Sequence, residues 1–299
     1  MNVLVVGSKG FIGSHVCRFY SAAGHRVFGA DIVMDDSCMD YTILDPIDND
    51  FTPLFKGRKI DICINCSGAA NVSFSIENPL HDYQLNTTNV FRLLNAIRLY
   101  APGVQFVNLS SAAVYGNPSE LPICEDAQMQ PVSPYGFHKL QAEVLCREFW
   151  ECFGIRSATL RIFSAYGPGL RKQLLWDLYQ KFTTQSIVEL WGTGGESRDF
   201  IYVSDVVQAI DCVVRYSKFE ADVVNVANGK EVTIRTVVDI FTRELHSGKP
   251  VEFNGKTRAG DPLNWQADVA HLQSYGYRQQ MDMEQGIKAY IEWIEREQK

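Results

Sequence analysis

This sequence of 299 residues predicts a doubly wound α/β fold with a parallel sheet, followed by a smaller α/β lobe. In the first half, short and nearly continuous apolar segments alternate with longer amphipathic segments. That alternation is typical of parallel strands buried on both faces between helices. The alternation ends after Arg161, and shorter elements follow irregularly to the end of the chain, which predicts the second lobe.

The expected strands lie at residues 2–6, 26–31, 60–65, 104–110 and 155–162, and the expected helices lie at 11–23, 78–100 and 133–153. Gly24 and Gly154 follow two of these helices, where glycine commonly ends a helix. Ser133 and Pro134 are suited to the N-cap and the first position of the third helix. Residues 164–171 contain Gly-Pro-Gly and predict a loop.

Two domains follow from this division of the chain. Residues 1–166 form the first predicted domain, and residues 167–299 form the smaller one. A strand and a helix near 199–217 follow a glycine-rich turn, and we expect them to return to the sheet of the first domain. The predicted boundary is therefore interleaved.

Composition and charge exclude several classes of function. The chain has 28 basic and 35 acidic residues, a net charge of −7, and no run of five basic residues, which argues against nucleic acid and anionic membrane as partners. No apolar run approaches the roughly 20 residues of a membrane span, and the start lacks the basic residues of a signal peptide. The eight cysteines are scattered and the six histidines form no His-x-x-x-His pair. We therefore expect a reduced, cytoplasmic protein without a metal site.

A glycine-rich turn joins the first expected strand to the first expected helix. Gly7 makes the tight turn, Gly10 lets the backbone approach a pyrophosphate, and Gly13 lets the helix pack on the strand. Asp31 ends the second strand, where a carboxylate accepts hydrogen bonds from ribose hydroxyls and repels a 2′-phosphate. This arrangement predicts NAD rather than NADP as the cofactor. The expected cofactor ligands here are Gly7, Lys9, Gly10, Phe11, Ile12, Gly13 and Asp31, with Asp40 on the adenine.

Further motifs follow in order along the chain. Tyr135 and Lys139 lie four residues apart and so project from one face of a helix. The motifs are LSSAAVYG at 109–116, SPYGFHK at 133–139, RIFSAYGPG at 161–169 and GTGGESRDFIYVSD at 192–205. Together with the glycine turn they resemble the extended short-chain dehydrogenase/reductase superfamily, in its branch that acts on nucleotide sugars. The resemblance covers nearly the whole chain and implies a Rossmann-type NAD-binding domain followed by a nucleotide-sugar-binding lobe.

The resemblance implies a role for each matching catalytic residue. Tyr135 is the expected general acid and base, Ser111 binds the reacting sugar hydroxyl, and Asn86 is a structural and relay residue. Lys139 and Tyr135 also contact the cofactor, with Lys139 on the nicotinamide ribose. A tyrosine must lose about 3 units from its usual pKa of ~10 to work near neutral pH. A neighbouring cation supplies ~1–3 units, so we expect Lys139 and the positive nicotinamide ring to act together.

Two alanines restrict the reaction that the resemblance allows. Nucleotide-sugar 4,6-dehydratases carry an Asp-Glu pair where this chain has Ala112 and Ala113, and related decarboxylases keep the glutamate. Alanine transfers no proton, so both activities are disfavoured. We expect an epimerase that inverts carbon 4 of a UDP-hexose through a 4-keto intermediate. A nucleotide 4-keto-sugar reductase using NAD(P)H is the alternative, followed by an NAD-binding regulator without catalysis.

The resemblance also places the substrate contacts. Arg198 and Arg258 are expected to hold the nucleotide's diphosphate or ribose, since two local cations suffice despite the net negative charge. Ser164 stands where asparagine is usual, and Trp265 is expected to line the pocket beside carbon 2 of the sugar. Ser111 and Tyr135 complete the expected substrate site. The helices around 82–100 and 135–153 pair across a two-fold axis in the family, which predicts a homodimer.

Overall fold

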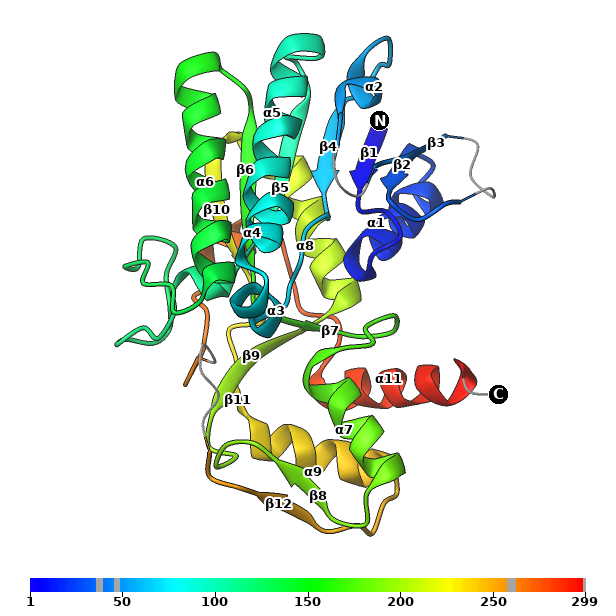
Figure 1. Ribbon diagram of the computed structural model, residues 1–299, viewed down its shortest axis with the longest axis vertical. Coiled ribbons are helices and arrows are strands. Elements are labelled where there is room, and N and C mark those ends of the chain that lie inside the picture. The colour runs from blue at the N-terminus through cyan, green and yellow to red at the C-terminus, as the bar shows by residue number, and fades with distance from the viewer. Residues whose placement is uncertain (36–39, 46–48, 257–261, 298–299) are drawn as a thin grey trace.

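The structure is a computed structural model that describes residues 1–35, 40–45, 49–256 and 262–297. Arg258, one of the two arginines expected to bind the nucleotide, lies outside these residues. The chain folds into an upper part built around one large sheet and a lower part with two small sheets (Figure 1). No helix among the described residues is long and apolar enough to cross a membrane.

Among the described residues, seven strands form the large sheet, and every neighbouring pair in it is parallel. The strands are β1 (Asn2–Val6), β2 (Arg26–Asp31), β3 (Tyr41–Ile43), β4 (Ile62–Asn65), β5 (Gln105–Ser111), β6 (Ser157–Ile162) and β10 (Glu220–Val226). Their order is β10-β6-β5-β4-β1-β2-β3. The chain therefore winds outward from β1 in both directions, and the predicted doubly wound parallel sheet is confirmed.

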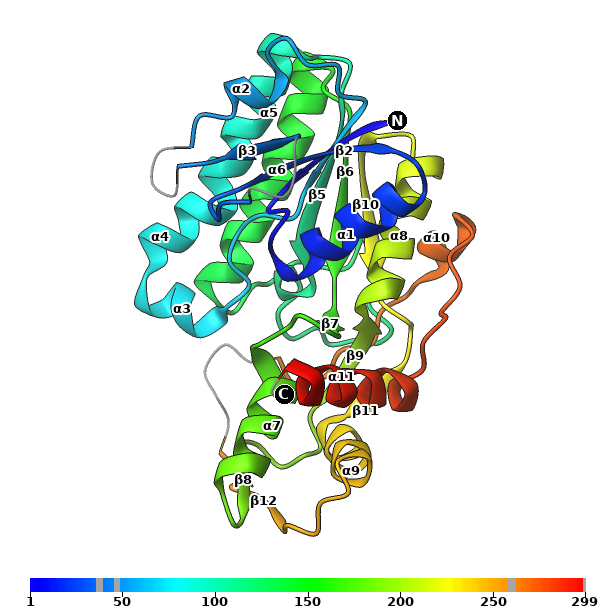
Figure 2. The same cartoon turned by 90° about the vertical axis from the view of Figure 1, so that its right-hand side faces the viewer.

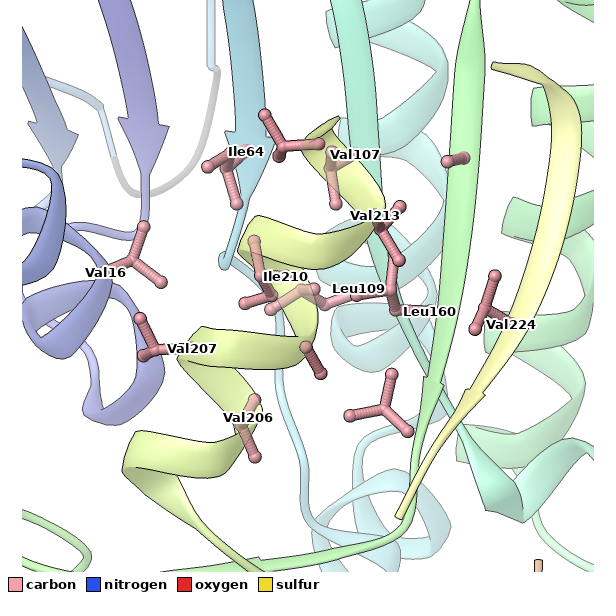
Figure 3. Packing of buried hydrophobic residues seen from close by; sticks show 14 of the residues in the cluster. Val16, Ile64, Val107, Leu109, Leu160, Val206, Val207, Ile210, Val213 and Val224 are labelled. Carbon is pink, nitrogen blue, oxygen red and sulfur yellow. The ribbon is translucent and has the colours of Figure 1, made fainter. Parts of the chain in front are cut away.

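Helices cover both faces of this sheet. On one face lie α1 (Phe11–Ala22) and α8 (Val203–Tyr216), and on the other lie α2 (Thr52–Phe55), α5 (Asn89–Tyr100) and α6 (Pro134–Phe153). Figure 3 shows Ile210 and Val213 of α8 beside Leu109 and Leu160 of the strands, in one buried cluster. All four side chains are buried or nearly so, which explains why the central strands are apolar along their whole length.

The long helix expected over residues 78–100 is present but contains a defect. It consists of α4 (Pro79–Tyr83), a π-helical turn at Gln84–Thr88, and α5. A short helix, α3 (Val72–Glu77), precedes it. A π-turn inserts one extra residue per turn and often marks a functional site. This one carries Asn86.

The lower part contains most of the remaining elements (Figure 2). Strands β7 (Ser164–Tyr166), β9 (Ser197–Tyr202) and β11 (Glu231–Thr233) form one small sheet, and β8 (Val188–Leu190) pairs with β12 (Val251–Phe253). Helices α7 (Gln173–Thr184), α9 (Ile234–Glu244) and α11 (Met283–Glu297) pack with them around a separate apolar core. Helix α10 (Ala270–Ser274) instead lies beside α8 and β10 of the upper part.

Two expectations about this region were wrong in detail. Residues 164–166 form β7 rather than a loop, because they pair with β9 in parallel. The strand near 200 is β9, which pairs with β7 and β11 and does not join the large sheet. Helix α8 and strand β10 are the segments that return to it, with β10 beside β6. The domain division at residues 166 and 167 stays a prediction.

Candidate functional site

Gly7, Asp31, Ser111, Tyr135 and Lys139 of the predicted site lie at the carboxyl edge of the large sheet. Strand β1 leads into Gly7, β2 ends at Asp31, and β5 ends at Ser111. Since these strands are parallel, their carboxyl ends lie along one edge, which is where open α/β sheets bind ligands. Helix α6 brings Tyr135 and Lys139 to the same edge, because Lys139 Nζ donates to Leu109 O of β5 at 2.9 Å.

The glycine turn is built so closely that two of its positions exclude a side chain. Gly7 has a φ of +79°, and a Cβ there would lie 2.7 Å from the Cys66 backbone. A Cβ on Gly13 would lie 2.0 Å from Gly7 O. Gly10 is exposed and caps α1 without any side-chain hydrogen bond. The first and third glycines therefore shape the turn, and the second leaves it open to a ligand.

These residues fit NAD. The first turn of α1, beginning at Phe11 and Ile12, has no side-chain cap and no acidic residue, so its N–H groups suit a pyrophosphate. Asp31 accepts hydrogen bonds from Lys9 N at 2.8 Å and Ile32 N at 2.7 Å, which fixes its carboxylate beside the turn. The Lys9 ammonium itself pairs with Asp35.

Asp40 does not lie where an adenine contact requires it. Its carboxylate binds the Arg26 guanidinium in a bidentate pair, at 2.8 Å and 3.0 Å. Arg26 is the first residue of β2, so this pair sits at the amino end of the strand, opposite the edge that carries Asp31. Asp40 instead joins the sheet edge through its backbone, which accepts from Gly29 N. We therefore withdraw Asp40 as an adenine contact.

The structure brings Ser111, Tyr135 and Lys139 together. The Ser111 hydroxyl lies close enough to the Tyr135 hydroxyl to lower the pKa of Tyr135, and Lys139 Nζ lies 5.9 Å from the centre of the Tyr135 ring. Ser111 also caps the short 3-10 turn Ala112–Val114 by accepting from Ala113 N. Ser133 caps helix α6 through Gly136 N, as predicted, and this cap sets the direction of the helix that presents the pair.

Burial dominates the acid–base properties of this pair. It raises the pKa of Tyr135 to about 12, and the nearby Ser111 hydroxyl offsets only part of this. Burial also lowers the pKa of Lys139 to about 8. Lys139 therefore does not by itself lower the pKa of Tyr135 far enough to make it a base near neutral pH. Additional positive charge at the site is required, which agrees with the expected contribution of an oxidised nicotinamide ring.

Asn86 belongs to a buried polar cluster that the sequence did not reveal. Its amide Nδ2 donates to Asp82 Oδ1 at 3.0 Å, and Asp82 Oδ2 lies 2.6 Å from His138 Nδ1. Asp82 and Asn86 are essentially fully buried. The sequence offered two signals for this cluster. Asp82 and Asn86 are four residues apart in an expected helix, and His138 is next to Lys139, but each pattern is common by chance.

The expected substrate residues come from three separate segments. Ser164 begins β7, two residues after Ile162, which pairs with Ser111 in the sheet. The Arg198 guanidinium lies 5.6 Å from the Trp265 ring, and Trp265 Nε1 donates to Gly116 O at 3.0 Å. Trp265 thus ties the C-terminal segment to the turn after Ser111. The structure places these residues near the site, and their substrate contacts stay predictions.

Comparisons with known proteins agree with this geometry. The chain is 26% identical to a putative UDP-glucose 4-epimerase from Methanocaldococcus jannaschii, with 98% of each protein covered. Among solved structures it resembles MoeE5 in complex with UDP-glucose and NAD, with a TM-score of 0.91, 28% identity and full coverage of both chains.

A second structure is the UDP-N-acetylglucosamine 4-epimerase from Methanobrevibacter ruminantium M1, in complex with UDP-N-acetylmuramic acid. The TM-score is 0.89 at 26% identity, over 99% of this chain and 98% of that one. Residues 3–227 match the NAD dependent epimerase/dehydratase family, which spans the whole cofactor side of the site. The chain belongs to that family.

Proposed function

We propose that this protein is an NAD-dependent nucleotide-sugar epimerase that inverts carbon 4 of a UDP-hexose. The observation that carries this proposal is the buried pair Tyr135 and Lys139 with Ser111 beside it, at the edge that also holds the glycine turn and Asp31. Similar proteins named as UDP-sugar 4-epimerases support the reaction and the substrate class.

The residues of the chain suit a reversible oxidation and reduction of one sugar carbon. The glycine turn and Asp31 would hold NAD, which would supply the hydride acceptor for the oxidation and the hydride donor for the reduction. Tyr135 removes the proton from the sugar hydroxyl as that carbon is oxidised and returns it as the carbon is reduced again. Ser111 holds the hydroxyl against Tyr135, and Lys139 holds positive charge beside the phenolate. The cycle neither gains nor loses a proton or an electron pair.

The neighbouring turn disfavours chemistry at other carbons. Ala112 is fully buried and Ala113 has no group that titrates, so this turn offers no acid or base beyond Tyr135. Dehydration and decarboxylation both need such a group. The names of the similar proteins favour the epimerase over the reductase and over a regulator without catalysis.

Incubation with a panel of UDP-, GDP-, CDP- and dTDP-sugars tests the proposal. NMR of each mixture should show one UDP-hexose converting to its 4-epimer without added cofactor. Tyr135→Phe should bind NAD as the wild type does and show no turnover, because only the phenolic hydroxyl is removed. A stoichiometric requirement for reduced cofactor would identify a reductase instead.

A homodimer formed through α4–α5 and α6 is part of this proposal. Tyr83, Phe91 and Val144 on these helices are 39%, 43% and 55% exposed. They line a groove of about 440 Å³ with Thr87, Thr88, Gln141 and Leu145. An apolar groove on two neighbouring helices suits the same groove of a second copy, related by a two-fold axis.

Sedimentation of two charge variants tests the dimer. Val144→Glu places a charge within the groove and should convert the protein to a monomer. Ile187→Glu is the matched control, because Ile187 is 47% exposed in the lower part, away from the groove. A wild type that stays monomeric at every concentration would contradict the proposal. The cytoplasmic location and the nucleotide contact of Arg258 stay predictions.

A further inference from the structure

A buried carboxylate beside the catalytic pair has no part in the mechanism above. Asp82 lies on α4, outside the glycine turn and the strand ends, and none of its surface is exposed. Its two oxygens have different partners: Oδ1 accepts from Asn86 Nδ2, and Oδ2 contacts His138 Nδ1. Burying a carboxylate is unfavourable unless its hydrogen bonds are satisfied, so this arrangement indicates a specific role.

The first hydrogen bond determines how the Asn86 amide is oriented. Because Asp82 Oδ1 can only accept, the amide nitrogen must face it, and Asn86 Oδ1 must face the other way. That oxygen is buried and has no hydrogen-bond donor among the described residues. A Cβ on Gly68 would lie 2.5 Å from it and 3.5 Å from Lys139 Nζ. Asp82 thus holds an unused acceptor beside the catalytic lysine.

The second contact ties Asp82 to the catalytic helix. His138 lies between Tyr135 and Lys139 in the chain, and the Tyr83 ring packs edge-on against its imidazole at 5.3 Å. The backbone of His138 also accepts from Thr87 Oγ1 at 3.0 Å, one residue after Asn86. Helix α6 is therefore fixed to the π-turn at the level of the catalytic pair.

The charge of Asp82 acts on both members of that pair. It raises the pKa of Lys139 against the lowering effect of burial, and it also raises the pKa of Tyr135. The other charged or titratable groups around Lys139 are Glu143 on its own helix, Cys66 after β4 and Lys172 before α7. Among these groups Asp82 has the largest effect on the lysine, and it is the one that also reaches the tyrosine.

We propose that Asp82 is a positioning residue of the catalytic site. It orients the Asn86 amide, fixes α6 through His138, and holds a negative charge beside Tyr135 and Lys139. This proposal rests on the proposed epimerase function for its kinetic consequences, but its effect on Tyr135 does not depend on the sugar.

Asp82→Asn separates the charge of this residue from its shape. The variant keeps an oxygen for Asn86 and removes one unit of negative charge, which near a buried group is worth about 1–3 pKa units. Burial lowers the pKa of Lys139 to about 8, so we expect the alkaline midpoint of the wild-type kcat profile to follow this lysine, and we expect Asp82→Asn to move that midpoint to lower pH by about one unit. Asp82→Ala should lower kcat further, since it also releases Asn86. A merely structural Asp82 would lower kcat and leave the midpoint in place, and that result overturns the proposal.

The Tyr135 phenolate provides a measurement that needs no substrate. Its near-ultraviolet absorbance is obtained as the difference between each protein and its Tyr135→Phe counterpart, which cancels the other 12 of the 13 tyrosines. The midpoint of this titration should be lower in Asp82→Asn than in the wild type, because the carboxylate raises the pKa of Tyr135. Equal midpoints overturn the proposal even if the enzyme is an epimerase, whereas a shift without any epimerase activity supports it and refutes only the function.

Two further variants complete the test. Glu292→Gln removes the charge of a half-exposed side chain on α11. It should leave the kcat midpoint and the Tyr135 absorbance midpoint unchanged. If Asp82→Asn does not fold, His138→Gln takes its place in the test. This variant loses the contact between α6 and Asp82, so kcat should fall severalfold. Because the charge of Asp82 remains, the alkaline midpoint should equal that of the wild type. A kcat equal to the wild type in that variant overturns the proposal.

Discussion

The cofactor side and the substrate side of the site are built in different ways. The expected cofactor side has Gly7, Gly13 and Asp31 on one continuous stretch, in which Gly7 follows β1, Gly13 lies in the first turn of α1 and Asp31 ends β2. The expected substrate side comes from Ser164, Arg198 and Trp265, which belong to three segments joined by long-range contacts such as Trp265 Nε1 to Gly116 O. Backbone geometry determines the first, and side-chain packing determines the second.

This difference predicts how each side responds to substitution. A close backbone contact cannot relax without moving a strand or a helix, so changes in the glycine turn should be severe and specific to the cofactor. Side chains held by one or two hydrogen bonds can shift, so changes on the substrate side should be graded. The variants below test this contrast.

Gly13→Ala should have the largest effect. The new methyl group would lie 2.0 Å from Gly7 O, so α1 must move away from the turn. We expect NAD affinity to fall about a hundredfold, equivalent to about 3 kcal/mol, as measured by calorimetric titration. Gly103→Ala, in the turn between α5 and β5, is the control, because its Cβ would meet nothing within 4 Å and its φ lies outside the left-handed region. Equal losses in the two variants would show that the glycine turn is not the cause.

Trp265→Phe should have an intermediate effect confined to the substrate. Phenylalanine keeps the edge-on contact with Phe163 at 5.8 Å but loses the N–H donor to Gly116 O. A buried carbonyl without its donor costs about 1–3 kcal/mol, so KM for the UDP-sugar should rise about tenfold while NAD affinity stays the same.

Trp293→Phe in α11 is the matched control, since Trp293 packs on Tyr290 in the lower part. Steady-state kinetics on both variants separates KM from kcat. An unchanged KM in Trp265→Phe would contradict a substrate role for this segment and leave Trp265 as a residue of the core.

The same contrast explains which features the sequence could predict. The strands of the large sheet are apolar throughout, and the glycine turn and Asp31 lie close together in the chain, so their pattern is local. The short strand β7 was missed because its pairing partner β9 begins only at Ser197, and three residues carry no periodicity. The strand returning to the sheet was assigned near 200 instead of to β10 for the same reason: pairing depends on distant residues.

The catalytic edge shows the same limit. Tyr135, Lys139 and Ser111 were assigned from motifs, and the structure brings them together. Asp82 was missed because a single aspartate in a helix has no signature, and the π-turn that aligns it with Asn86 cannot be read from residue types. Asp40 was assigned by its position after β2, but a carboxylate binds the nearest cation, and here that is Arg26.

Asp40→Asn should have the smallest effect on NAD affinity. It tests whether the cofactor side extends as far as Asp40. The Arg26–Asp40 pair lies at the amino end of β2 and is largely exposed to solvent, where ion pairs contribute little. We expect NAD affinity within about twofold of the wild type, whereas Asp31→Asn should weaken binding severalfold, because Asp31 lies at the carboxyl end beside Lys9. Calorimetric titration of the two variants under the same conditions compares them directly. If Asp40→Asn lost as much affinity as Asp31→Asn, the adenine would have to reach the edge strand β3, and the cofactor side would no longer be a local structure.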